Sequence, residues 1–294
     1  MDHRAALLVL LKQRLMTLID AMPAAQAGDM RSVHQARVAS RRLREALPVL
    51  RASVDGHALS RVRRQVRRMT RALGPVRELD VALAHLDELA GRDIVSTRAL
   101  GRVRQAVAHE RLHRRRDMLA EITPGKVEKL RHRLREVSSG EETPDSAPAL
   151  DEVTGQVGKR ARRLLAAMER AGGLYLPDRL HAVRIAVKKL RYVMEIEREL
   201  KRSRATARIT QLKRLQDLLG RMHDFEILID RTRQVQAELA TSDRKLTMEL
   251  DALVRMLEAE CRADHATYMR RRASILKLCE SLKPAEEMRS RAVA

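Results

Sequence analysis

The sequence predicts an all-α fold, and three observations carry this prediction. Apolar residues recur every three or four positions along most of the chain, for example at Leu212, Leu215 and Leu219, which is the spacing of an amphipathic helix. Strong helix formers such as Ala, Leu, Arg and Glu dominate the composition. The aromatic residues that often fill β-sheets are almost absent, because the 294 residues include three Tyr, one Phe and no Trp.

Glycine and proline residues predict where the helices end. We expect Pro23 to close a first helix, Gly28-Asp29 to cap a second, and Pro48 to kink or end that second helix. Further breaks are expected at residues 55–56, 74–75, 91–93, 123–125, 174–178, 220 and 241–243.

One polar stretch, SSGEETPDSAP at residues 138–148, has almost no bulky apolar residue and lies near the middle of the chain. It predicts a linker between two helical units. The expected division is an N-terminal bundle over residues 1–137, a linker over 138–149, a C-terminal bundle over 150–284 and a tail over 285–294.

The two halves share two sequence blocks. HQARVASRRLR at residues 34–44 matches HAVRIAVKKLR at 181–191, and LGPVRELD at 73–80 matches LGRMHDFE at 219–226. Both pairs lie at nearly the same offset, close to half of the chain. This agreement predicts an internal duplication, with two related helical bundles that face each other across a pseudo-two-fold axis.

The first block of each pair places basic residues on one face of a helix. At about 100° per residue, the four basic residues of each copy fall within an arc of about 80°, opposite an apolar ridge. Such like charges repel each other, so the repeated stripe predicts a ligand that neutralises it. Arginine and lysine donors suit phosphate oxygens. The alternative is a pair of solvated helix faces that form ion pairs with the 39 acidic residues. The stripes are His34, Arg37, Arg41 and Arg44 in the first copy and His181, Arg184, Lys188 and Arg191 in the second.

The net charge of +21 predicts a polyanionic partner, which is nucleic acid, an anionic membrane surface or a phosphate polymer. Single-strand binders stack bases on aromatic side chains, and this chain has few. A basic helical protein can still bind a duplex backbone, so nucleic acid remains the main rival. A scaffold for acidic proteins is a third class. No apolar run is long enough to span a membrane, and the run over residues 5–11 is too short and too soon followed by charge for a signal peptide.

No motif predicts catalysis or a cofactor. HERLH at residues 109–113 has the spacing of a zinc-binding helix, but no third ligand follows at a familiar distance and three arginines come directly after it. No glycine-rich phosphate loop occurs. Cys261 and Cys279 fit burial in helices and a reducing cytoplasm better than a disulfide framework. We therefore expect a cytoplasmic binding protein that is not an enzyme and holds no metal or cofactor.

The paired blocks closely resemble the conserved-histidine α-helical domain (CHAD) family, and the resemblance covers nearly the whole chain. It implies two four-helix bundles around a central basic cavity that binds inorganic polyphosphate, and association with polyphosphate granules. Arg42 and Lys189 lie at the side of the basic arc, so we expect them to line only the edge. The lining that the resemblance implies is His34, Arg37, Arg41, Arg42, Arg44, Arg67 and Arg77 from the first half and His181, Arg184, Lys188, Lys189, Arg191, Lys213 and His223 from the second.

Overall fold

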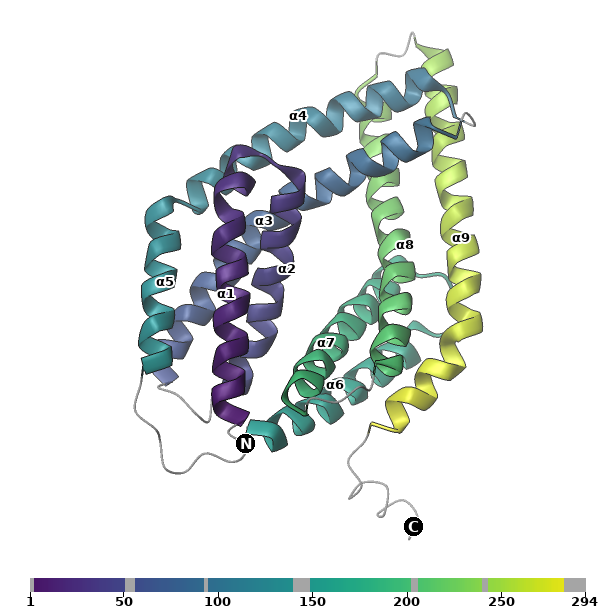
Figure 1. Ribbon diagram of the computed structural model, residues 1–294. Helices are drawn as coiled ribbons and strands as arrows, with labels where there is room; N and C mark the ends of the chain where they lie inside the picture. Colours follow the sequence, from purple (N-terminus) through teal and green to yellow (C-terminus); the bar gives the residue numbers. More distant parts are fainter. Residues whose placement is uncertain are drawn as a thin grey trace.

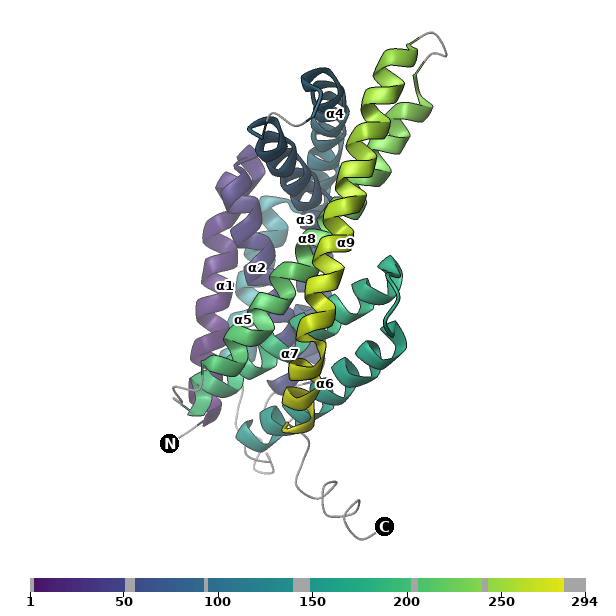
Figure 2. The same cartoon turned by 90° about the vertical axis from the view of Figure 1, so that its right-hand side faces the viewer.

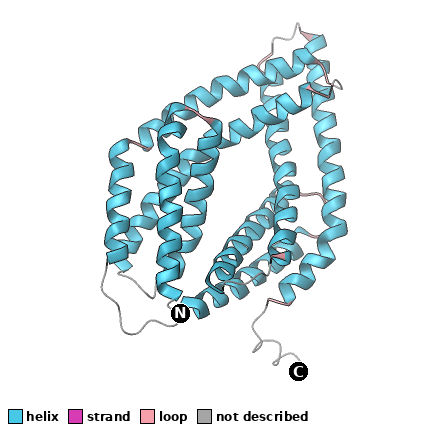
Figure 3. Ribbon diagram, in the orientation of Figure 1, coloured by secondary structure: helices cyan, strands magenta, loops and turns pink. Residues whose placement is uncertain are grey.

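The computed structural model describes residues 3–50, 56–92, 95–139, 149–201, 206–239 and 243–282. Within these ranges the structure has α-helices, one short 3-10 helix and no strand, which confirms the all-α prediction (Figure 3). The elements are α1 (His3–Ala27), α2 (Met30–Ala46), η1 (Leu47–Leu50), α3 (Gly56–Ala90), α4 (Thr97–Glu121), α5 (Pro124–Ser139), α6 (Ala149–Ala171), α7 (Pro177–Lys201), α8 (Ala207–Ala237) and α9 (Arg244–Glu280).

Two pairs of long helices meet in the molecule. In Figures 1 and 2, α3 and α4 run from beside α1, α2 and α5 to the last part of α8 and the first part of α9. α6 and α7 lie beside the first half of α8 and the last part of α9, and α7 also contacts α2. None of the helices in the described ranges is long and apolar enough to cross a membrane.

The apolar core consists of three clusters. The first packs α1, α2 and α5 against the first half of α3 and includes Ile196 and Leu200 of α7. The second packs α6 and α7 against parts of α8 and α9. The third joins the second half of α3 and the first half of α4 to α8 and α9, around residues such as Phe225 and Leu250. Two of the three clusters therefore contain side chains from both halves of the chain.

The internal duplication and the domain division stay predictions. Most of the expected linker over 138–149 and the whole tail over 285–294 fall outside the described residues.

The start and end of α2 follow from local chemistry. The chain turns at Gly28, whose φ of +101° suits glycine. Asp29 then caps the helix, because its Oδ2 accepts a hydrogen bond of 2.7 Å from the Ser32 amide. Pro48 lies in η1 directly after the helix, so the expected end there is confirmed. The apolar face of α2 is buried, as its spacing predicts, at Val33, Ala36, Ala39, Leu43 and Ala46.

Three expected helix breaks are wrong. Pro23 lies inside α1, Gly74-Pro75 lies inside α3, and Gly220 lies inside α8. An interior proline or glycine weakens a helix, but tertiary packing can outweigh that local cost. Around the second of these sites Leu73 and Val76 are both completely buried, so the core holds α3 together across the proline.

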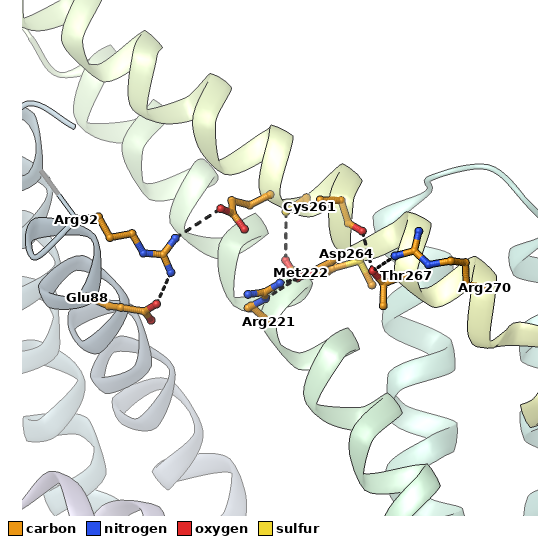
Figure 4. A network of polar contacts seen from close by, with 10 residues as sticks. Glu88, Arg92, Arg221, Met222, Cys261, Asp264, Thr267 and Arg270 are labelled. Atoms are coloured by element: carbon orange, nitrogen blue, oxygen red, sulfur yellow. Dashed lines mark hydrogen bonds and ion pairs between the residues drawn. The ribbon is translucent and has the colours of Figure 1, made fainter. Parts of the chain in front are cut away.

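Polar contacts tie the third cluster together at its surface (Figure 4). Arg221 of α8 donates from Nε to Oδ2 of Asp264 on α9 at 2.7 Å. The Asp264 side chain is 4% exposed, so this pairing satisfies a nearly buried charge. Arg92 follows α3 and pairs with Glu88 and, at 3.5 Å, with Glu260 of α9. These contacts fix α3 and α8 relative to α9.

A candidate anion site between α2, α3, α7 and α8

A cavity of about 230 Å³ opens between α2 and α3 of the first half and α7 and α8 of the second. Among the described residues, its lining is rich in basic side chains and contains two carboxylates. This part of the lining has no cysteine, serine or threonine to act as a nucleophile. The lining consists of His34, Arg37, Val38, Arg41, Arg77, Glu78, Val81, Arg184, Lys188, Tyr192, Gln216, His223, Asp224 and Ile227.

The structure brings half of the implied basic residues together at this cavity. Both halves of the chain contribute, and each motif block supplies at least one residue. The residues at the cavity are His34, Arg37, Arg41, Arg77, Arg184, Lys188 and His223. The implied residues outside its lining are Arg42, Arg44, Arg67, His181, Lys189, Arg191 and Lys213.

The implied residues outside the lining have other surroundings. Arg191 pairs with Glu195 and donates from Nε to Oε1 of Gln216 at 3.0 Å. Arg191 therefore holds Gln216, which lines the cavity, without lining the cavity itself. Arg42 also pairs with Glu195, at 3.8 Å. Arg44 pairs with the neighbouring Glu45 at 3.8 Å, and Lys189 is half-buried. Arg67 and Lys213 are exposed.

Gly74 lets Arg37 pack against the backbone of α3. The Arg37 Nη1 donates to the carbonyl oxygen of Thr70 at 3.1 Å. A Cβ atom at position 74 would lie 2.9 Å from this same Nη1, which is closer than the two atoms can pack. Gly74 of the LGPVRELD block therefore makes room for Arg37 of the HQARVASRRLR block.

Arg184 also lies beside α8, but without the close approach to a glycine that Arg37 makes. A Cβ at Gly220 would lie 4.0 Å from Arg184 Nε. The Nη2 of Arg184 lies 4.0 Å from Oδ1 of Asp224. Its Nε is buried and has no hydrogen-bond partner within the described residues. A buried donor without a partner is costly, and a bound anion would satisfy it.

Lys188 carries the strongest electrostatic perturbation in the cavity. Lys188 is buried, with 6% of its surface exposed. This burial, together with the positive charges of Arg184, Arg41 and Arg37, lowers its pKa to about 6. Asp224 acts in the opposite direction but is too weak to compensate. The lysine is therefore mostly neutral at pH 7 as long as no anion is bound.

His181 and His223 contact each other at the edge of the cavity. Their Nδ1 atoms lie 3.3 Å apart. Burial and the charge of Arg184 lower both pKa values, that of His223 to about 4. His181 lines a second cavity of about 320 Å³, which shares His223 and Ile227 with the first.

Sequence reasoning missed several lining residues. Glu78 and Asp224 are visible in the matched LGPVRELD and LGRMHDFE blocks, so the repeat gave a signal for them. Tyr192 directly follows the second basic block. Gln216 carries no signal, because its place in the lining depends on the packing of α7 against α8.

The two histidines of the HERLH segment have no third metal-ligating side chain beside them among the described residues. His109 and His113 are exposed on α4, and their ring centroids lie 4.7 Å apart. Glu110 pairs with Arg231 of α8 and with Arg114. Within the described part of the chain, no group of three or more His, Cys, Asp or Glu side chains is placed to hold a metal ion.

The fold and the cavity together define an all-α protein with a cation-rich cavity between two helix pairs. The family model of the CHAD domain matches residues 10–233, and the chain belongs to the CHAD-domain family. No curated protein matches the sequence.

Two solved structures share the fold. The crystal structure of the CHAD domain from the plant Ricinus communis is 22% identical, with a TM-score of 0.63, over 89% of this chain and 91% of that chain. PptA from Streptomyces chartreusis is 15% identical, with a TM-score of 0.67, over 94% of this chain and 98% of that chain. At these identities the likeness shows the fold.

Proposed function

We propose that this protein binds inorganic polyphosphate in the cavity between α2, α3, α7 and α8, and that it is a binding module and not an enzyme. The observation that carries the proposal is the burial of several basic side chains at one place. Arg37 and Arg41 of α2 and Arg184 and Lys188 of α7 all line the cavity and are buried or half-buried. Glu78 and Asp224 supply only part of the opposite charge.

A phosphate polymer supplies what this arrangement lacks. Burying unpaired cations costs free energy, and a bound phosphate chain repays that cost through charge-assisted hydrogen bonds. Because the cations come from both halves of the chain, a linear polymer can contact them in succession. Membership of the CHAD family, which is linked to polyphosphate, supports the same ligand.

Polyphosphate fits better than nucleic acid. Tyr192 is the only one of the chain's four aromatic residues in the lining, so the cavity offers little surface on which bases could stack. A polymer without bases needs no such surface. We further propose a cytoplasmic protein that associates with polyphosphate granules through this contact.

Charge reversal at one arginine from each half tests the proposed site. The double variant Arg37→Glu and Arg184→Glu should abolish binding of long-chain polyphosphate while circular dichroism shows unchanged helicity. The matched control is Arg255→Glu and Arg271→Glu, which reverses two exposed charges on α9 outside the cavity. Normal polyphosphate binding by the cavity variant would show that the site is wrong.

A further inference from the structure

A second cationic surface lies outside the cavity, on the first half of α3. Within nine residues this helix exposes five arginines, a surface that we call the α3 ridge. On a helical wheel the five fall within an arc of about 140°, and from first to last they rise about 12 Å along the axis. The ridge consists of Arg63, Arg64, Arg67, Arg68 and Arg71.

The arginines of the α3 ridge lack acidic partners. In the described part of the chain none of them pairs with a carboxylate, and the one side-chain hydrogen bond that a ridge arginine donates runs from Arg64 to the Ser60 hydroxyl. By contrast, Arg61 just before the ridge pairs with Glu136 of α5. Several ridge arginines stand three or four positions apart, where like charges on a helix repel each other. The free protein therefore carries an uncompensated charge on this face.

The α3 ridge begins beside the edge of the cavity. Arg37 of α2 reaches the Thr70 carbonyl on α3. His34, one turn earlier on α2, lies near Arg77, which is two turns later on α3, so α2 and α3 run antiparallel. Arg41 lies one turn beyond Arg37 on α2 and therefore comes level with Arg67 on α3. Arg44 lies two turns beyond Arg37 and comes level with Arg63.

The helical wheel places this contact on the ridge side of α3. Thr70, Arg67 and Arg63 share an arc of about 60°, so they face the same edge of the helix. Cations thus continue from the cavity along α2 and over onto α3.

At its other side the α3 ridge borders a groove. Arg68 and Arg71 line a hollow of about 460 Å³ together with Arg114 of α4. The two carboxylates of this groove are already engaged, because Asp117 pairs with Arg114 at 3.6 Å and Glu121 pairs with Lys126 at 3.4 Å. The ridge arginines are left available for an external anion.

We propose that the α3 ridge is a second contact surface for polyphosphate, which holds the part of a long chain that extends beyond the cavity. The proposal rests on the proposed function of the cavity. Its occupant is a flexible polyanion, because only such a ligand can bend from the cavity edge at Arg41 over Arg44 onto the ridge. The exposed arginines then act as a row of phosphate contacts, each of them weak and screened by salt.

The test compares long-chain polyphosphate with tripolyphosphate. The ridge variant replaces all five arginines by glutamine, as Arg63→Gln, Arg64→Gln, Arg67→Gln, Arg68→Gln and Arg71→Gln. Both residue types are good helix formers, so α3 should persist. The matched control removes five exposed charges from α9, as Arg244→Gln, Lys245→Gln, Arg255→Gln, Arg270→Gln and Arg271→Gln.

We expect the ridge variant to lose on the order of tenfold in affinity for long chains, with a shallower dependence of affinity on salt. Its affinity for tripolyphosphate should equal that of the wild type, because this ligand fits within the cavity. The α9 control should lose much less for long chains. Unchanged long-chain affinity in the ridge variant, or an equal loss in the control, would overturn the proposal.

Two further outcomes separate this proposal from the function of the cavity. If the ridge variant loses affinity for duplex DNA but not for long-chain polyphosphate, the ridge belongs to a nucleic-acid interface and the proposal is wrong. If Arg37→Glu with Arg184→Glu leaves tripolyphosphate binding intact, the cavity assignment itself fails, and the inference built on it fails with it.

Discussion

The Nδ1 atoms of His181 and His223 lie 3.3 Å apart, on two helices that meet beside the basic cavity. Two protonated imidazoles at this distance would repel each other, and neighbouring cations add to the repulsion. The pair is therefore neutral near pH 7 in the free protein. The permanent charges of the cavity come from its arginines, whereas its histidines and Lys188 can gain charge when an anion binds.

Polyphosphate binding should accordingly tighten as the pH falls from 8 toward 6. The pKa of Lys188 is lowered to about 6 in the free protein, and a bound polyanion raises it. The bound state then holds more protons than the free state between these two pKa values, so affinity rises as pH falls through that window. One proton changes affinity by up to about tenfold per pH unit. Calorimetry in two buffers of different ionisation enthalpy measures the uptake.

Lys188→Arg provides the control for this prediction. An arginine keeps its charge at every accessible pH, so the variant should bind long-chain polyphosphate with less proton uptake and a flatter pH profile. An identical proton uptake in the variant and the wild type would assign the effect to another group.

Replacement of Gly74 by alanine should weaken binding without destabilising the protein. The added methyl group would lie 2.9 Å from Arg37 Nη1 and should push this flexible guanidinium out of position. Alanine also favours the helix by about 0.5–1 kcal/mol. We expect an affinity loss on the order of tenfold with an equal or higher melting temperature, measured by titration and by thermal unfolding.

Gly101→Ala is the matched control, because a Cβ there meets nothing within 4 Å. It should give the helical gain on α4 and leave polyphosphate affinity unchanged. Equal affinities of Gly74→Ala and Gly101→Ala would contradict the role of the close approach between Arg37 and α3.

Asp224→Asn should lower the stability of the free protein and increase the stabilisation by polyphosphate. Asp224 lies 4.0 Å from Arg184 and 3.9 Å from His85, and it opposes the positive charge around Lys188. Without it, the ligand is the main source of negative charge. We expect the free protein to lose about 1 kcal/mol and the melting temperature to rise further on ligand addition.

The control for this variant is Asp117→Asn, which removes a carboxylate with a 71% exposed side chain from α4. It should leave both melting temperatures nearly unchanged. A ligand-induced rise in Asp224→Asn no larger than in the wild type would count against the electrostatic account.

Zinc should not stabilise the protein through HERLH. Glu110 is held by Arg231 and Arg114, so it is not available as a base, and the surrounding arginines disfavour a dication. We expect equimolar zinc to leave the melting temperature unchanged. A rise that His113→Ala abolishes would show a metal site.

The helical class and the basic face could be predicted from the sequence because both depend on spacing along one helix. The predicted basic face of α2 lines the cavity through His34, Arg37 and Arg41. The helix ends at Gly28 and Pro48 follow from local backbone chemistry. The continuity of α3 through Pro75 could not be predicted, because it depends on long-range packing on both sides of the proline.

The full set of residues that line the cavity also could not be predicted from the sequence. Its composition depends on how α7 and α8 pack against α2 and α3, which decides that Gln216 lines the cavity. The matched positions Arg67 and Lys213 illustrate the same limit. Because they align in the repeat, we expected both to line the cavity like the stripe residues. Each lies on a helix face that leaves its side chain exposed.

Competition between polyanions tests the central claim most directly. Labelled long-chain polyphosphate is titrated against the protein at physiological salt, with duplex DNA, RNA and heparin as competitors. The proposed cavity predicts that unlabelled polyphosphate competes best and that DNA displaces the probe only weakly. Tighter binding of DNA than of polyphosphate, or equal binding of all four polyanions, would contradict a cavity built for a phosphate chain.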